Sequence, residues 1–226
     1  MTSFLLKMIG IISMLCDHSG DAIIKNFSNF NLIGRFAFPI FAFQAANGYI
    51  HTRNLKNYMI RLLIFAIISQ IPFMLFISTY SNNFSLNIFF TLLLGICSLY
   101  VYDKINNKIL GFAAVIAISI IAQLIKVDYG AFGVLAIFLF YLFKNDKLKM
   151  VISFLLICIG KYTLYTIQNP ILYQYYIKLG IFTFLAIIPI LFFNNKEGPK
   201  LKYFFYIFYP LHLIVLWFIS MFLLKG

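Results

Sequence analysis

The sequence has few charged residues and very few acids. Only 11% of its 226 residues are charged, whereas a soluble domain of ordinary composition carries about 25%. Asp and Glu together number six, while 63% of the residues are hydrophobic. A soluble fold of this size could not cover so much apolar surface, because folded chains of this length keep a large exposed area. The composition therefore predicts an integral membrane protein, with the lipid bilayer acting as the solvent.

Several kinds of site are also missing. The three cysteines, Cys16, Cys97 and Cys158, lie singly within apolar segments without metal-ligand spacing, so we expect small core residues and no metal site. No P-loop, HExxH zinc motif or GxSxG elbow occurs. The first apolar segment contains Asp17 and His18 and lacks a small-residue cleavage site, which argues against a cleavable signal peptide.

The net charge of +12 does not indicate a nucleic-acid partner, because Lys and Arg lie in short connections between apolar segments. That distribution is typical of loops held on the cytoplasmic side of a membrane. No internal repeat, soluble domain or low-complexity linker interrupts the pattern. We therefore expect a single transmembrane domain covering residues 1–226.

Apolar segments of about 17–25 residues, long enough to cross a bilayer, recur along the chain. They predict an all-α, polytopic membrane protein with about nine transmembrane helices around a central cavity. The sixth segment is short and the eighth contains Lys178 and Pro189, so the count carries a margin of about one. The predicted spans are residues 4–24, 32–50, 58–78, 86–102, 109–125, 129–143, 151–167, 173–193 and 203–224.

Basic residues are concentrated in alternate connections between these spans. The second, fourth, sixth and eighth connections carry groups of lysine and arginine, beginning with Arg53 and Lys56, whereas the odd-numbered connections carry few. The positive-inside rule then places the even connections and the N-terminus in the cytoplasm. With an odd number of spans, the C-terminus lies outside.

Ionisable side chains at membrane depth need a reason, because inserting a charged one costs at least about 2.5–3.5 kcal/mol. At the helical rise, Asp17 and His18 lie about 20 Å across the first span, in its outer half. Arg35 shortly follows the outer loop, and Asp128 opens the sixth span, so both are expected at a similar level. His212 lies near the midplane of the last span.

Two interpretations of these residues stay open. Adjacent residues on a helix point in directions about 100° apart, so Asp17 and His18 cannot simply pair with each other. His18 either faces a cavity, where imidazole can take and return a proton near neutral pH, or is a hydrogen-bonded structural histidine. Asp17 and Arg35 either form a buried structural ion pair or take part in catalysis. His212 either binds substrate or ties two helices together.

Two further groups of polar residues have competing explanations. Arg53, Lys56 and Arg61 cluster at the second connection, where the arginine fork suits phosphate binding, although the insertion rule alone also explains a basic loop. Asn87 begins a span, and interhelical hydrogen bonds explain such uncharged polar residues adequately.

Six short motifs, taken together and in order, are specific. They are DH at residue 17, GRFAFPIF at 34, HTRN at 51, SQIPF at 69, DYGAFG at 128 and FYPLHL at 208. In this order the sequence resembles the TraX family of membrane proteins, and the resemblance covers essentially the whole chain. TraX proteins are associated with N-acetylation of conjugative pilin and are distantly similar to a wider superfamily of transmembrane acyltransferases.

The resemblance implies an acetyltransferase of the bacterial inner (plasma) membrane. An acyl-CoA donor, with acetyl-CoA expected, enters from the cytoplasm, and an amine or hydroxyl of a protein such as pilin, or of a glycan, is modified at the outer face. Carried over position by position, with Lys56, Arg61 and Asn87 added from the sequence, the site residues fall into three groups. These are catalytic His18, Asp17 and Arg35, donor-binding Arg53, Lys56 and Arg61, and substrate-binding Asp128, Tyr129, Tyr209, His212 and Asn87.

The mechanism expected from these roles is proton abstraction by His18 from the acceptor. Arg35 stabilises the oxyanion, and Asp17 holds the imidazole or balances Arg35. An acyl-histidine intermediate is the alternative chemical route. The alternative functions are a proton-coupled transporter or flippase and, third, a membrane assembly factor without chemistry.

Overall fold

The computed structural model describes residues 1–24, 29–81, 83–199 and 201–224. Within these ranges the chain is helical, and its β structure is limited to an isolated parallel bridge between Leu86 and Val127. The all-α prediction is therefore confirmed.

The described helices form two compact units, and most of the boundaries between them fall within helices. Unit 1 comprises Met1–Phe41, Pro72–Asn83 and Val151–Gly226, and unit 2 comprises Ala42–Ile71 and Phe84–Met150. Helices α3 (Ala37–His51), α4 (Leu55–Ile77) and α8 (Lys147–Gln168) contribute to both units. The expected single transmembrane domain stays a prediction.

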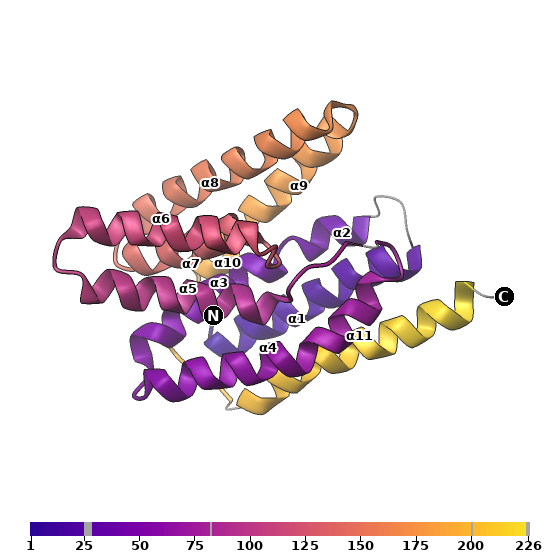
Figure 1. Cartoon of the computed structure of the whole chain (residues 1–226), viewed down its shortest axis with the longest axis horizontal. Coiled ribbons are helices and arrows are strands. Elements are labelled where there is room, and N and C mark those ends of the chain that lie inside the picture. Colours follow the sequence, from indigo (N-terminus) through magenta and orange to yellow (C-terminus); the bar gives the residue numbers. More distant parts are fainter. Residues whose placement is uncertain (25–28, 82, 200, 225–226) are drawn as a thin grey trace. The chain divides into compact units, whose positions relative to one another are not determined.

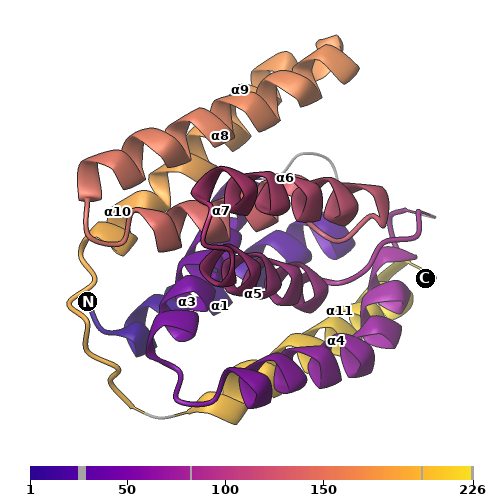
Figure 2. The same cartoon turned by 60° about the vertical axis from the view of Figure 1, so that its left-hand side comes forward.

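Unit 1 is built around the first and last helices of the chain. Helix α1 packs against α2 and α11, and the π-helical segment η1 that continues α1 also packs against α11. Helices α8 and α9 run side by side in opposite directions (Figures 1 and 2), tied by a 2.6 Å hydrogen bond between the hydroxyls of Tyr162 and Thr183. The segments are α1 (Ser3–Ser19), η1 (Gly20–Ile24), α2 (Asn29–Gly34), α8 (Lys147–Gln168), η2 (Pro170–Leu172), α9 (Tyr173–Leu185), α10 (Ile187–Leu191) and α11 (Lys202–Leu224).

Unit 2 contains three helices that pack against one another, α5 (Ile88–Lys104), α6 (Lys108–Leu124) and α7 (Gly130–Leu142) (Figure 2). Two of them begin at asparagine caps. The side-chain oxygen of each cap accepts hydrogen bonds from backbone N–H groups of the first helical turn, which have no partner within the helix. Asn87 caps α5 through the N–H of Phe89, and Asn107 caps α6 through two N–H groups. These caps separate apolar segments that hydropathy alone would leave poorly bounded.

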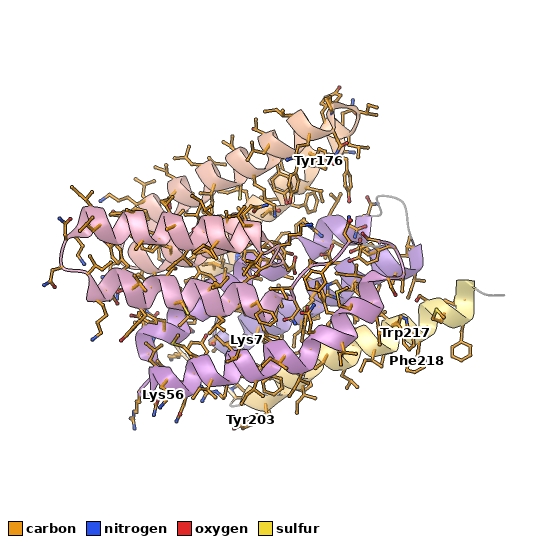
Figure 3. All side chains as sticks on the ribbon, viewed as in Figure 1. Lys7, Lys56, Tyr176, Tyr203, Trp217 and Phe218 are labelled. Carbon is orange, nitrogen blue, oxygen red and sulfur yellow. The ribbon has the colours of Figure 1, made fainter. Side chains whose placement is uncertain are left out.

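Large apolar side chains cover much of the protein's surface. Ile171 is 95% exposed, Ile109 and Phe222 are each 80% exposed, and Figure 3 shows Phe218 projecting from α11. Soluble monomers rarely expose large contiguous apolar patches, so this surface suits a bilayer. Among the described residues, the helices long and apolar enough to cross one are Leu55–Ile77, Lys147–Gln168, Pro170–Leu191 and Tyr203–Leu223, with shorter apolar helices at Lys108–Leu124 and Gly130–Leu142. The membrane assignment is supported, while the count of nine spans and the central cavity stay predictions.

Two of the predicted spans are not continuous helices. The second, residues 32–50, is divided where α2 ends at Gly34 and α3 begins at Ala37. The eighth, residues 173–193, is interrupted for the one residue Ala186 between α9 and α10, within the longer apolar helix Pro170–Leu191. In both cases a proline, Pro39 or Pro189, lies in the first turn of the following helix, where its missing N–H is tolerated. Hydropathy stays high through these prolines, so an apolar-segment search does not see the breaks.

Candidate functional site in unit 1

The motif that contains Asp17 and His18 ends an α-helix and begins a π-helix. The N–H of Gly20 points back to the carbonyls of Cys16 and Asp17, and the chain continues as η1 to Ile24. π-Helical turns are rare overall, and many of those that do occur lie at functional sites. Because η1 packs on α11, this turn brings the end of α1 against the last helix of the chain.

Asp17 is the centre of a buried polar cluster between α1 and α2. It is 6% exposed and forms an ion pair with Nη2 of Arg35, whose Nε donates to the Asn31 carbonyl at 3.1 Å. Asn31 Nδ2 lies 3.3 Å from Asp17 Oδ1 and 2.7 Å from Asp21 Oδ1. The pairing of Asp17 with Arg35 agrees with the sequence-based expectation, and it is compatible with either a structural or a catalytic role.

Asp21 and Asn31 are members of this cluster that the sequence analysis missed. Asp21 lies four residues after Asp17, a spacing that places two side chains on neighbouring parts of a helical surface. In a chain with only six acids, that spacing was the available signal. Asn31 is 5% exposed and carried no comparable signal, since it lies near a connection where polar residues are expected.

Gly34 explains why the arginine of the GR motif can reach Asp17. A Cβ atom built on Gly34 would overlap the Asp17 side chain. A residue without a side chain is therefore required for α2 to approach α1 this closely. Arg35 then follows at the end of α2, within reach of the carboxylate.

His18 has a different partner, His212 of α11. His18 Nδ1 lies 2.7 Å from His212 Nε2, and the two ring planes differ by 4°. The ring centres are 5.0 Å apart, close to the largest separation that this N–N distance permits, so the rings meet edge to edge in a common plane. The structure therefore brings together two candidates whose sequence positions differ by 194.

Aromatic rings surround the histidine pair. Phe76, which is 1% exposed, lies with its ring centre 4.8 Å from that of His18. The ring centres of Phe208 and Tyr209 lie 5.0 and 5.7 Å from the ring centre of His212. His212 is 5% exposed and Tyr209 is 4% exposed, whereas His18 is partly exposed. Of the two residues, His18 is therefore the less buried.

In unit 2, Asn87 closes gaps in backbone hydrogen bonding. Its Nδ2 donates to the Ala66 carbonyl at 2.7 Å and to Gln70 Oε1 at 2.9 Å, and its Oδ1 accepts from the Phe89 N–H at 3.0 Å. Asn87 is 0% exposed. These contacts give Asn87 a structural role, and its assignment to substrate binding stays a prediction.

Asp128 and Tyr129 lie in a tightly held loop before α7. The N–H of Asp128 donates to the Leu86 carbonyl at 2.7 Å, and its own carbonyl accepts from the Thr91 hydroxyl. Tyr129 and Gly130 have positive φ values of 65° and 48°. Only a residue without Cβ adopts such a conformation readily, which explains the glycine of the DYG motif. The substrate role of Asp128 and Tyr129 stays a prediction.

The three donor-binding candidates lie along the connection from α3 to α4 and the first two turns of α4. Arg53 and Lys56 are exposed, and Figure 3 shows Lys56 at the beginning of α4. Arg61 is partly buried, its guanidinium lies 5.8 Å from the ring centre of Tyr58, and its Nε is buried without a hydrogen-bond partner among the described residues. The beginning of a helix and three cations together favour the binding of an anion.

The candidates therefore fall into two sets. Asp17, His18, Arg35, Tyr209 and His212 lie in unit 1, and Arg53, Lys56, Arg61, Asn87, Asp128 and Tyr129 lie in unit 2. Over the described parts of the chain, no group of three or more His, Cys, Asp or Glu residues is arranged to hold a metal ion.

Comparisons with known proteins agree with these motifs. The model of the family described as TraX protein matches residues 3–220. A probable fimbrial assembly protein FimC, serogroup H1, of Dichelobacter nodosus is 28% identical over 98% of this chain and 97% of its own length. An uncharacterized protein of Rickettsia prowazekii is 27% identical over 65% of this chain and 57% of its own length. No solved structure matches the chain. Since the family match spans nearly the whole sequence, the chain belongs to the TraX family.

Proposed function

We propose that this protein is a membrane acetyltransferase that moves an acetyl group from cytoplasmic acetyl-CoA to an amine or hydroxyl of an acceptor at the outer face. The observation that carries the proposal is the histidine pair at the end of α1. His18 is partly exposed and bonded to His212, beside the ion pair of Asp17 with Arg35. Ionisable groups within the apolar helices of a membrane protein are rare and commonly mark functional sites, which supports the proposal.

In the proposed reaction, His18 is the general base. It takes a proton from the acceptor's N–H or O–H as the acceptor nitrogen or oxygen bonds to the acyl carbon, a contribution worth about 10²–10⁴-fold in rate. The C–S bond of the thioester then breaks, and the proton passes from His18 to the thiolate, giving CoA–SH. Arg35 stabilises the oxyanion formed in between.

Asp17 balances the charge of Arg35 and does not hold the imidazole. The carboxylate is engaged by Arg35 and Asn31, while the imidazole of His18 is held by His212. Of the two roles expected for Asp17, these contacts support balancing the charge of Arg35. Holding one guanidinium in place before the reaction is the preorganisation that electrostatic stabilisation requires.

Arg53, Lys56 and Arg61 are proposed to bind the phosphates of the acetyl-CoA donor. Arginine forks suit phosphate oxygens, and the buried Nε of Arg61 is a donor that an anion could satisfy. The positive-inside rule places this connection in the cytoplasm, together with the N-terminus, where acyl-CoA is available. The membrane is then the inner membrane of a bacterium.

The acceptor is proposed to be a fimbrial or pilin subunit, with a glycan as the alternative. The relative from Dichelobacter nodosus, which matches 98% of this chain, is named as a probable fimbrial assembly protein. An extracytoplasmic subunit of a fimbria reaches the outer face of the inner membrane before assembly, which fits modification on that side.

The first test is binding of acetyl-CoA to purified protein in nanodiscs. Arg53→Ala is expected to weaken binding, whereas His18→Ala should bind normally but fail to transfer the acetyl group to a fimbrial acceptor peptide. Lys144→Ala is the matched control. Lys144 lies in another connection that the positive-inside rule assigns to the cytoplasm, but it is outside the donor cluster. If folded wild-type protein binds no acyl-CoA, the transferase proposal is wrong. A proton-coupled transporter or flippase then becomes the leading function, tested by substrate counterflow in vesicles.

A further inference from the structure

We propose that His212 is a positioning residue that sets the tautomer of His18 and makes Nε2 of His18 the atom that receives the acceptor's proton. This inference rests on the proposed function, in which His18 is the base. It adds a specific atom and a second residue, which neither the motif nor the family membership assigns.

The direction of the hydrogen bonds follows from a backbone carbonyl. His212 Nδ1 lies 2.9 Å from the Phe208 carbonyl oxygen, which can only accept, so Nδ1 of His212 carries a hydrogen. A neutral imidazole has one N–H, which leaves Nε2 of His212 as an acceptor. His18 Nδ1, 2.7 Å away, must then be the donor. The single N–H of His18 is used in this bond, and its Nε2 keeps the lone pair.

These hydrogen-bond directions require both rings to be neutral, and the surroundings of the rings favour that state. His212 is 5% exposed and lies against Phe208 and Tyr209. An unpaired charge in such apolar surroundings is costly. Two imidazolium rings could not form the observed contact at all, because each would present an N–H to the other.

The geometry also sets the place of the acceptor. Because the two rings meet edge to edge through Nδ1 of His18, Nε2 of His18 lies on the far side of its ring from His212. In a histidine, the hydrogen bond made by one ring nitrogen sets the protonation of the other and therefore which nitrogen reacts. When Nε2 takes the proton from the acceptor, the imidazolium that forms donates from Nδ1 to the waiting lone pair of His212, which strengthens that bond. His212 therefore supports the charged state without touching the substrate.

The decisive measurement is nitrogen NMR of protein labelled with ¹⁵N-histidine in nanodiscs. The chain has three histidines, so His18, His51 and His212 can be assigned by single substitutions. The expected signal of wild-type His18 is the neutral form with hydrogen on Nδ1. His212→Leu should move the hydrogen to Nε2. His212→Gln should retain the wild-type form, because the glutamine oxygen can accept from Nδ1 of His18.

Transfer kinetics provide the second readout. His212→Leu is expected to lower kcat, by less than the about 10²–10⁴-fold expected for loss of the base itself, and to leave the KM for acetyl-CoA within about twofold. His212→Gln should recover most of the lost kcat. His51→Gln is the matched control, since His51 bonds only to a backbone carbonyl of its own helix in the contacts described, and it should leave the tautomer of His18 unchanged.

The outcomes separate this inference from the function it rests on. A wild-type His18 with hydrogen on Nε2, or equal losses of kcat in His212→Leu and His212→Gln, would overturn the positioning role. If His212→Leu does not fold, the wild-type spectrum and the glutamine variant still decide. The expected tautomer in a protein that transfers no acetyl group would support the geometry and overturn the transferase proposal.

Discussion

Two groups of predicted site residues, one in each unit, differ in the partners they use. In unit 2, the side chain of Asn87 bonds to the backbone of Ala66 and Phe89 and to the side-chain amide of Gln70. In unit 1, Asp17, His18 and His212 bond to side chains that are themselves ionisable or amide-bearing. The first arrangement closes gaps that a helical membrane protein cannot leave open. The second holds charges and protons in place.

The same difference separates family motifs that backbone geometry explains from those that it does not explain. DYG and DH are both short, acid-containing motifs, and both precede or end a helix. The DYG loop is explained by a positive φ and backbone hydrogen bonds, whereas nothing in backbone geometry requires a histidine at position 18. Substitutions at Asn87 and in the DYG loop should therefore affect stability, whereas substitution of His18 should affect activity.

The largest effect is expected from His18→Ala. Removing the proposed base should lower kcat for acetyl transfer about 10²–10⁴-fold, with little change in the melting temperature of the purified protein. Single-turnover transfer from labelled acetyl-CoA is the measurement. Full activity in a folded His18→Ala protein would contradict the role of His18 as the base and, with it, the contrast drawn between the two groups of residues.

Asp17→Asn is expected to have the largest effect on stability. It leaves Arg35 without its carboxylate in a buried setting, which costs about 3 kcal/mol, near the lower end for buried pairs because the Arg35 side chain is 20% exposed. Unfolding in mixed detergent micelles gives the value. The double variant Asp17→Asn/Arg35→Gln should recover much of the loss. If the recovered double variant is also active, the ion pair is structural only.

Gly34→Ala should weaken the same cluster through packing. The added Cβ overlaps Asp17, so α2 must move away from α1, at about 1–3 kcal/mol. Gly160→Ala is the matched control, because nothing lies within 4 Å of the added atom on α8. It should stabilise the protein by about 0.5–1 kcal/mol. Equal effects of the two substitutions would contradict the close approach of α1 and α2.

Asn87→Ala tests unit 2. Loss of the cap and of the buried bonds to Ala66 and Gln70 should destabilise the protein by about 2 kcal/mol and leave the KM of the acceptor unchanged. Asn107→Ala removes an exposed cap and should cost only about 0.5–1 kcal/mol. A raised acceptor KM in Asn87→Ala, without loss of stability, would support the substrate-binding prediction instead.

Part of the site could be predicted because its signals are local. Asp17 and His18 stand out as ionisable residues within an apolar segment, and their adjacency excludes a direct pair. Arg35 was predictable as a partner because it follows the next connection closely. The contact of His18 with His212 was not predictable, since residues 194 apart in sequence carry no spacing that indicates contact. Asp21 lay within the same motif region and was missed because its role depends on Asn31.

The membrane assignment and the helical class followed from the amino-acid sequence alone. Both depend on hydropathy and charge summed over short segments, and such sums do not require knowledge of the fold. The helix breaks near Arg35 and Ala186, the π-helical turn after Ser19 and the partners of each polar side chain were decided by the tertiary structure. The physical reason is that a hydrogen bond depends on distances and directions of a few tenths of an ångström and a few tens of degrees, which only packing between distant helices sets.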